Sequence, residues 1–228
     1  MSSVNWNTLL DIDNHRIPHL TIKHKERIGS LSTNLGKVFE ANIQQSAKDQ
    51  GLFFYRIKDV NPMALKQSFG VSKNKYDCIL FANGHLFPLE LKSTKSKSVS
   101  FSESMIKSQQ IKHLKEAAEY EGVLPGFLFN FREPENRVFF VHIKDFLTYK
   151  NIAEKQLAHT YISKVNKSSI PINICEEIGT EVSWMKKKVN YTYYINKMCD
   201  NLIRKNQLLD NLSPSYIDDK PTMEVSTS

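Results

Sequence analysis

The clearest pattern of apolar and polar positions lies in residues 76–92, YDCILFANGHLFPLELK, where two apolar runs flank Asn83 and Gly84. An Asn-Gly pair between apolar runs is typical of a two-residue β-hairpin turn, because both central residues of that turn need positive φ. The turn also sets the register of the two strands. Ala82 faces His85, and every further pair follows by counting outward from the turn.

This register places two carboxylates side by side. Asp77 falls opposite Glu90, and alternation along a strand puts Asp77, Glu90 and Lys92 on one face. The other face is apolar and predicts a core: Cys78, Leu80, Phe87, Leu89 and Leu91. Directly opposed like charges destabilise a strand pair, so we expect something to compensate them. Pro88 lacks an amide donor, which predicts an irregularity where the next strand pairs with this one.

The remaining pattern predicts an α/β fold in which helices pack on a sheet. Helical spacing of apolar residues indicates helices at 34–50, 103–121 and 195–209, the second capped by Ser102 or Ser104. Apolar and aromatic runs predict strands at 52–57, 123–131 and 138–143. Weaker patterns indicate short helices at 145–149 and 152–161 and strands at 170–174 and within 184–194.

The flanking regions lack this periodicity. We predict an irregular N-terminal arm at residues 1–32, one domain with a C-terminal extension at 33–209, and a disordered tail at 210–228.

Charge and cysteine content narrow the class of protein. There are 31 Lys and Arg against 24 Asp and Glu, a formal charge of +7 that suits a polyanionic partner such as DNA. Cys78, Cys175 and Cys199 are widely spaced and odd in number, which indicates neither a disulfide framework nor a zinc site. No apolar run is long enough for a membrane span or a signal peptide. We therefore expect a cytoplasmic protein.

The order of Glu40, Asp77 and Glu90-Leu91-Lys92 resembles the PD-(D/E)xK nuclease superfamily, and within it the RecU-like Holliday junction resolvases. The stretches that look alike are Gly36–Glu40, Tyr76–Ile79, Leu89–Lys95, Ser100-Phe101 and Gln110–Leu114. The resemblance covers roughly residues 30–145 and implies a restriction-endonuclease-like mixed central sheet flanked by helices. The segment 58–75 is short for the stalk of these resolvases, and Tyr76 replaces the proline of the motif.

The resemblance also implies a site. Asp77, Glu90 and the Leu91 carbonyl would hold Mg²⁺, with Mn²⁺ as a substitute, since hard oxygen ligands suit these cations. Lys92 would position the attacking water, and Glu40 would bind a metal-bound water or a second metal. Gln110 would orient the site from its helix. Basic residues beside the site would contact DNA phosphates: Lys66, Lys73, Lys75, Lys95 and Lys97.

The function expected from the resemblance is a Mg²⁺-dependent, structure-selective endonuclease that resolves four-way DNA junctions in recombination or repair. Two matched cuts imply a homodimer. Two alternatives remain open, namely a non-catalytic architectural DNA-binding protein on the same fold and a sequence-specific restriction-type endonuclease.

Overall fold

Six strands form a mixed central sheet in a computed structural model, which describes residues 34–57 and 74–212. The strands, in their order across the sheet, are β1 (Phe53–Arg56), β2 (Cys78–Ala82), β3 (His85–Thr94), β5 (Gly126–Phe131), β6 (Arg137–His142) and β8 (Thr180–Glu181). Only the β3–β5 pair is parallel; the other four pairs are antiparallel. The predicted mixed sheet is confirmed.

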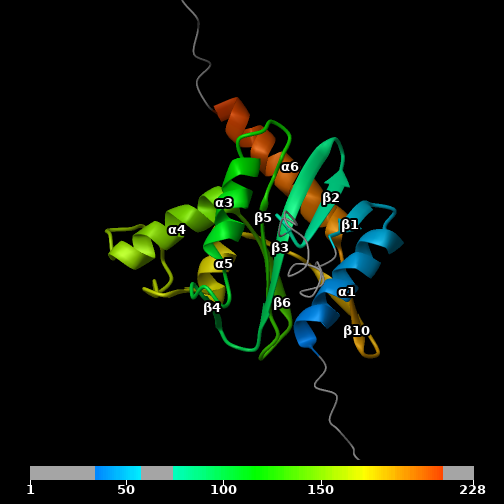
Figure 1. The fold of residues 1–228 in the computed structure, drawn as a ribbon, viewed down its shortest axis with the longest axis horizontal. Helices are drawn as coiled ribbons and strands as arrows, with labels where there is room; N and C mark the ends of the chain where they lie inside the picture. The colour runs from blue at the N-terminus through cyan, green and yellow to red at the C-terminus, as the bar shows by residue number, and fades with distance from the viewer. Residues whose placement is uncertain (1–33, 58–73, 213–228) are drawn as a thin grey trace, which may run out of the picture. The chain divides into compact units, whose positions relative to one another are not determined.

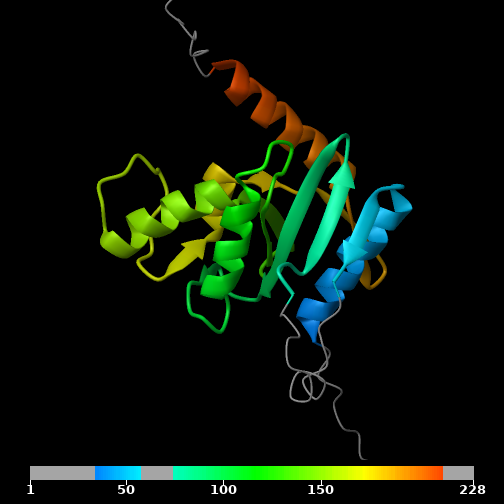
Figure 2. The ribbon, with the colours of Figure 1, turned by 45° about the horizontal axis from the view of Figure 1, so that its top comes forward.

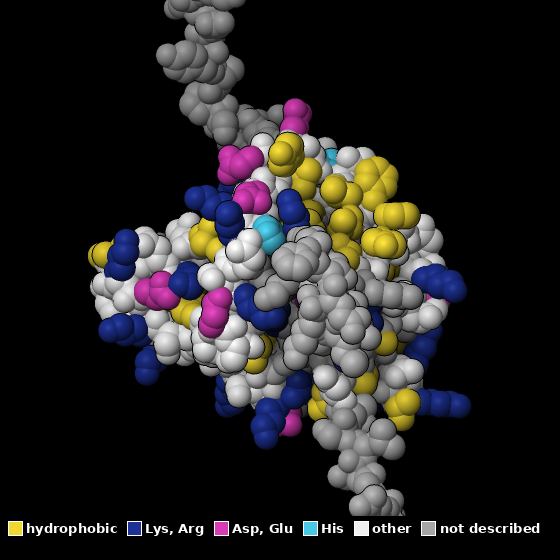
Figure 3. Space-filling view, viewed as in Figure 1, with side chains coloured by type: hydrophobic (Ala, Val, Ile, Leu, Met, Phe, Trp, Pro, Cys, Tyr) yellow, Lys and Arg dark blue, Asp and Glu magenta, His cyan; other side chains and the backbone are white. Residues whose placement is uncertain are grey.

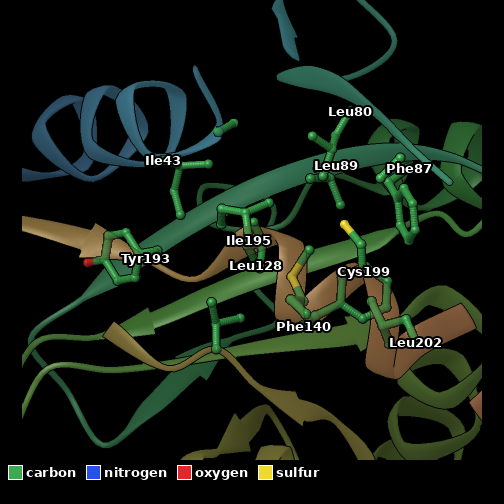
Figure 4. Close-up of a cluster of buried hydrophobic side chains, with 14 of the residues drawn as sticks. Ile43, Leu80, Phe87, Leu89, Leu128, Phe140, Tyr193, Ile195, Cys199 and Leu202 are labelled. Atoms are coloured by element: carbon green, nitrogen blue, oxygen red, sulfur yellow. The ribbon is translucent and has the colours of Figure 1, made fainter. Parts of the chain in front are cut away.

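Helices cover both faces of this sheet (Figures 1 and 2). Helices α1 (Leu35–Asp49) and α6 (Ile195–Leu212) pack on one face, and α3 (Ser108–Ala117), α4 (Ile143–Lys155) and α5 (Ile172–Ile178) on the other. Two small sheets complete the structure, β4 (Ser98–Ser100) with β7 (Ser169–Pro171) and β9 (Trp184–Lys187) with β10 (Asn190–Tyr193). The first face buries one apolar core, part of which Figure 4 shows.

The β2–β3 hairpin has the predicted turn and register. Asn83 and Gly84 both have positive φ, 49° and 78°, as the turn requires. Ala82 pairs with His85, and the register holds as far as the pair of Cys78 and Leu89. The predicted apolar face is buried in the core beneath α1 and α6.

The expected irregularity lies at Pro88. On this side β3 runs parallel to the segment that leads into β5. An isolated bridge joins Leu86 to Val123, and regular pairing begins only at Leu89 and Gly126. Because proline has no amide hydrogen, the ladder has a gap there.

The predicted helix at 103–121 is wrong at both ends, since α3 spans Ser108–Ala117. Its N-cap is Lys107 rather than Ser102 or Ser104, and the Gln110 side chain accepts a hydrogen bond from the Lys107 amide at 3.1 Å. The Glu103 carboxylate accepts from the Ser108 amide at 2.9 Å. Glu103 therefore lies outside the helix, where its carboxylate pairs one of the amide groups that the first turn of α3 leaves without a helical partner.

Two further predictions are corrected. The short helices expected at 145–149 and 152–161 are one helix, α4, which ends because Gln156 adopts the left-handed conformation with φ of 53°. The strand expected at 170–174 ends after three residues as β7, and α5 follows at once. The predicted helices at 34–50 and 195–209 and the strands at 52–57, 123–131, 138–143 and 184–194 are confirmed, with small shifts at their ends.

The predicted arm lies outside the described residues, as does the predicted tail from residue 213 onward. Residues 210–212, predicted as the start of the disordered tail, instead belong to α6. In the part of the chain that is described, no helix is both long and apolar enough to cross a membrane.

His142 makes the stability of this fold dependent on pH. It is the N-cap of α4, and its Nδ1 accepts a hydrogen bond from the Lys144 amide at 3.3 Å. Burial, and then the charges of Lys144 and Lys205, lower the pKa of His142 to about 4. Since the unfolded chain binds this proton more readily, folding loses stability as pH falls from about 6.5 towards 4.

We predict that His142→Asn, which keeps a capping acceptor without titrating, loses less stability on acidification than the original protein. Between pH 7 and 4.5 the difference should be on the order of 2 kcal/mol. Urea unfolding at both pH values measures it. Equal losses in the two proteins would contradict this role of His142.

Candidate active site

Asp77 lies one residue before β2. Its backbone is outside the regular pairing of β2 with β3, but its side chain accepts a hydrogen bond from β3. The Asp77 amide donates to the Leu89 carbonyl at 3.2 Å, while the Leu91 amide donates to Asp77 Oδ2 at 2.9 Å. Asp77 therefore does not form the backbone pair with Glu90 that the register predicts, because its carboxylate takes the place of a backbone acceptor. This bond holds the Asp77 carboxylate against β3.

Glu90 is the buried acid of the site, with only 1% of its surface exposed. It lies on β3 on the same face as Phe127 of β5, its partner in the sheet. Burial, and then the neighbouring Asp77 carboxyl, raise the pKa of Glu90 to about 8, although Lys92 opposes the shift. The two acids are close enough to influence each other, as the predicted common face requires.

Lys92 and Gln110 both donate to the same oxygen of Glu90. Lys92 Nζ lies 3.2 Å from Glu90 Oε2, and its side chain is 13% exposed. Gln110 Nε2, from α3, donates to the same Oε2. A buried carboxylate is costly unless it is paired and hydrogen-bonded, and these two donors meet that need. Gln110, predicted to orient the site from its helix, therefore contacts Glu90.

Glu40 reaches this region from α1, which covers the opposite face of the sheet. It forms an ion pair with Arg56 at the end of β1. Burial, and then the charges of Asp77, Glu90 and Glu40, raise the pKa of the Cys78 thiol. Arg56 pairs with Cys78, the residue after Asp77, so Glu40 approaches the start of β2 through Arg56. Arg56 is not among the site residues predicted from the sequence, where its only signal is its position as a basic residue at the end of an apolar strand.

A buried polar network supports β3 just beyond Lys92. Ser93 Oγ donates to Asn130 Oδ1 at 2.7 Å and accepts from Arg132 Nη1 at 2.9 Å. Asn130 Nδ2 donates to Asn136 Oδ1 at 2.7 Å, and the Asn136 amide lies 3.3 Å from the Tyr193 hydroxyl. The network joins β3, β5 and β10 through side chains alone. It was not foreseen, because its members are far apart in the sequence.

Three of the five lysines predicted to contact DNA lie within the described residues. Lys75, Lys95 and Lys97 are exposed. Lys66 and Lys73 lie outside the described residues. Lys95 directly follows β3, the strand that carries Glu90 and Lys92, and Lys97 lies between β3 and β4.

The donors at this site are oxygen atoms, the kind that Mg²⁺ and Mn²⁺ prefer. Within residues 34–57 and 74–212, no three His, Cys, Asp or Glu side chains gather as ligands. Asp77 and Glu90 are two adjacent carboxylates, and the Leu91 carbonyl follows Glu90 directly. Mg²⁺ is commonly held by one or two carboxylates and keeps several waters, so this sparse set of oxygen atoms suits it.

Comparison with known proteins gives a match to one family model and to one relative of high sequence identity. The model of the family described as RecU, Recombination protein U, matches residues 52–197, a range that contains Asp77, Glu90 and Lys92. The SPbeta prophage-derived uncharacterized protein YotM of Bacillus subtilis (strain 168) is 71% identical over 185 residues, which are 81% of this chain and 95% of that protein.

A solved structure of Hjc, a Holliday junction resolvase from Archaeoglobus fulgidus, is also similar. It matches with a TM-score of 0.38 and 14% identity, over 63% of this chain and 93% of the other. The family match extends over well more than half of the chain, and the Bacillus relative is aligned along nearly its whole length. The chain belongs to the Recombination protein U family.

Proposed function

We propose that this protein is a Mg²⁺-dependent endonuclease that cuts branched DNA, most specifically the four-way Holliday junction. The observation that carries the proposal is the convergence of Asp77, Glu90 and Lys92 on one face of the β2–β3 hairpin. Membership of the Recombination protein U family supports the choice of DNA as substrate. The formal charge of +7 agrees with a polyanionic partner.

Asp77 and Glu90, with the Leu91 carbonyl, are the residues that would hold Mg²⁺. When bound, the cation would polarise the scissile phosphate, offset its developing charge and lower the pKa of a bound water. The chain prepares this site in advance, because the Leu91 amide holds Asp77 and the Gln110 amide holds Glu90. A preorganised set of charges needs little rearrangement during the reaction.

Lys92 is the proposed catalytic cation. Its ammonium group lies 3.2 Å from Glu90 and is mostly shielded from solvent. From there it would hold the attacking water by a hydrogen bond and stabilise negative charge on the phosphate oxygens. Glu40 is proposed to bind a metal-bound water or a second cation, and doing so requires its pairing with Arg56 to rearrange.

The proposed substrate contacts are sequence-independent. Lys75, Lys95 and Lys97 are exposed near the hairpin ends and would bind phosphates, as would Lys66 and Lys73. Phosphate contacts position a protein on DNA without reading its sequence, which suits an enzyme that recognises the shape of a junction.

The experiment is to incubate the full chain with an end-labelled four-way junction, a linear duplex of the same sequence and a single strand. Each is tested with Mg²⁺, with Mn²⁺ and with EDTA. We expect paired cuts in the junction with either cation, at least about tenfold faster than in the duplex, and none with EDTA. The ratio of rates separates selectivity for branches from general nuclease activity.

Each alternative predicts a different pattern in the same assay. Binding to the junction without cleavage under any cation would show an architectural protein instead. Cuts at one fixed sequence in the linear duplex would show a restriction-type enzyme. Either outcome would replace the proposal.

Two symmetric cuts in one junction require two active sites. We therefore propose a homodimer as the active form, since a two-fold assembly matches the two-fold symmetry of the substrate.

A further inference from the structure

The hairpin of β9 and β10 ends in a run of lysines. Lys186 and Lys187 close β9, and Lys188 and Val189 form the turn before β10. We call these four residues the lysine tip. All four are exposed, Val189 by 82%. The turn lies at the lower right of Figure 1, and Lys and Arg side chains stand out at the same margin of Figure 3. The tip is therefore open to a partner.

The lysine tip carries a concentrated positive charge. The segment 184–194 contains three lysines and neither aspartate nor glutamate. Among the described residues, no ion pair joins the tip to a carboxylate, whereas Lys150 of α4 pairs with a glutamate one turn away. Lys186 Nζ lies 6.0 Å from the centre of the Tyr191 ring, which attracts the charge without neutralising it. An anionic partner would reduce the repulsion among the three ammonium groups.

Lys188 adopts a backbone conformation that lysine does not favour. Its φ is 51°, in the left-handed region that glycine and asparagine enter more readily. The β2–β3 hairpin, which also has a two-residue turn, places Asn83 and Gly84 there. No packing requires a lysine at this position, because Lys188 is exposed. Unfavourable backbone conformations are commonly kept where a ligand binds, so a ligand explains this lysine better than the fold does.

The base of the hairpin is fixed to both elements that carry the proposed active site. The Tyr193 ring packs edge-on against Phe39, the residue before Glu40, with 5.6 Å between the ring centres. The Tyr193 hydroxyl lies 3.3 Å from the Asn136 amide. That amide ends the buried network that starts at Ser93, next to the proposed catalytic lysine. A hairpin held in this way loses little conformational entropy on binding.

The lysine tip lies at the end of the molecule to which β3 leads. In Figures 1 and 2 the β9–β10 turn lies at the same end as the C-terminus of β3, opposite the β2–β3 turn. Lys95 follows β3 at this end, and Lys97 comes before β4. A strand rises about 3.3 Å per residue, so the chain from Tyr193 to Lys188 carries the tip about 15 Å beyond its anchor. The tip thus adds a second group of lysines at this end, away from the proposed site.

We propose that the lysine tip binds the phosphates of a duplex arm of the DNA substrate, away from the bond that is cut. The proposal rests on the proposed function, because that function supplies DNA as the ligand. Lysine binds phosphate as a point charge and reads no sequence. Surfaces for single strands add exposed aromatic rings on which bases stack, whereas Tyr191 is partly buried beneath Lys186. A two-stranded hairpin also fits the major groove of a duplex.

The test is junction binding by the full chain in EDTA, measured by fluorescence anisotropy at several salt concentrations. The variant carries Lys186→Gln, Lys187→Gln and Lys188→Gln together. Each phosphate contact that is lost lowers the slope of log K against log salt by about one. We expect the slope to fall by about two to three, and the dissociation constant to rise at least about tenfold near 0.1 M salt.

The matched control removes three exposed lysines from α4 and the segment after it, which lie across the molecule from the hairpin in Figures 1 and 2. They are Lys155, Lys164 and Lys167, each changed to glutamine. The control has the same net charge as the variant, and its slope should fall by no more than about one. An equal fall in both proteins would show a general effect of charge and would overturn the proposal.

A single change at the turn separates binding from folding. Lys188→Asn removes one charge and supplies a residue that adopts positive φ more readily. It should raise the urea concentration at the unfolding midpoint, yet weaken junction binding by about fivefold. Lys188→Arg keeps the charge and should bind within about twofold of the original protein. A more stable Lys188→Asn that binds as tightly as the original would identify Lys188 as a solvated lysine, against the proposal.

The outcomes separate this proposal from the proposed function. Unchanged affinity and salt slope in the triple variant would overturn the role of the lysine tip, whatever the cleavage rate. Junction binding without cleavage by the original protein would defeat the nuclease proposal, while affinity in EDTA would still decide the tip. Failure of the original protein to bind either junction or duplex would overturn both. Urea unfolding checks that the triple variant is folded, and Lys188→Asn decides the question if it is not.

Discussion

Replacing Asp77 with asparagine should lower the rate of junction cleavage by about 10³-fold, because one of the two carboxylates that hold the cation is lost. Asparagine keeps an oxygen that can accept the hydrogen bond of the Leu91 amide, which is 2.9 Å from Asp77 Oδ2 in the structure. The hairpin should therefore keep its geometry. Single-turnover cleavage of a labelled junction at saturating protein measures the effect.

The control for this variant is Asp49→Asn. Asp49 is an exposed carboxylate at the end of α1 that accepts a hydrogen bond from Gln45, so the substitution removes the same charge away from the site. Its cleavage rate should stay within about threefold of the original. Junction affinity in EDTA should be retained in both variants. A cleavage rate for Asp77→Asn close to that of the control would remove Asp77 from the catalytic site.

Replacing Gly126 with alanine should destabilise the fold by about 3 kcal/mol, because the sheet has no room for a methyl group there. A Cβ at this position would lie 2.5 Å from the Val141 carbonyl oxygen and 2.7 Å from the Phe140 ring. Gly126 pairs with Leu89 on one side and with His142 on the other. Relieving the clash would displace β5 from a neighbouring strand.

Urea unfolding measures this loss, and Gly36→Ala is the matched control. Gly36 lies in the first turn of α1, where the nearest atom to a new Cβ is the Asn34 side-chain oxygen at 3.3 Å. Its stability should change by no more than about 1 kcal/mol. Gly126 pairs with Leu89, which is next to Glu90. We therefore also expect the Gly126→Ala protein to cleave junctions more slowly than the loss of folded protein alone would explain. Equal stability of the two variants would show that the strands can shift apart without cost.

Local signals in the sequence predicted the hairpin well. Asn83 and Gly84 need positive φ, and no other turn between two apolar runs fits that pair so well, so the register followed by counting. The common face of Glu90 and Lys92 then depended only on strand periodicity. Asp77 was harder to place, because its side chain replaces a backbone acceptor and thereby ends the ladder one residue early.

Predictions failed where a distant side chain decided the local conformation. The first turn of α3 is displaced because Glu103 accepts the Ser108 amide from outside the helix. The continuity of α4 through 150–152 arises from burial of Tyr149 and Ala153 in one core, which a short window of sequence does not reveal. The network from Ser93 to Tyr193 depends on contacts between residues 37 and 57 positions apart, and spacing carries no signal of them.

The hydrogen bond between Asp77 and the Leu91 amide has a consequence for the thermodynamics of cation binding. The amide that holds Asp77 and the carbonyl proposed as a ligand belong to the same residue, Leu91, so both proposed ligands are fixed to a single segment of β3. A loop that collects its ligands on binding must lose conformational entropy, whereas a strand has lost it already during folding. The affinity for Mg²⁺ should therefore depend mainly on stripping water from the ion and from Glu90, and little on ordering the chain.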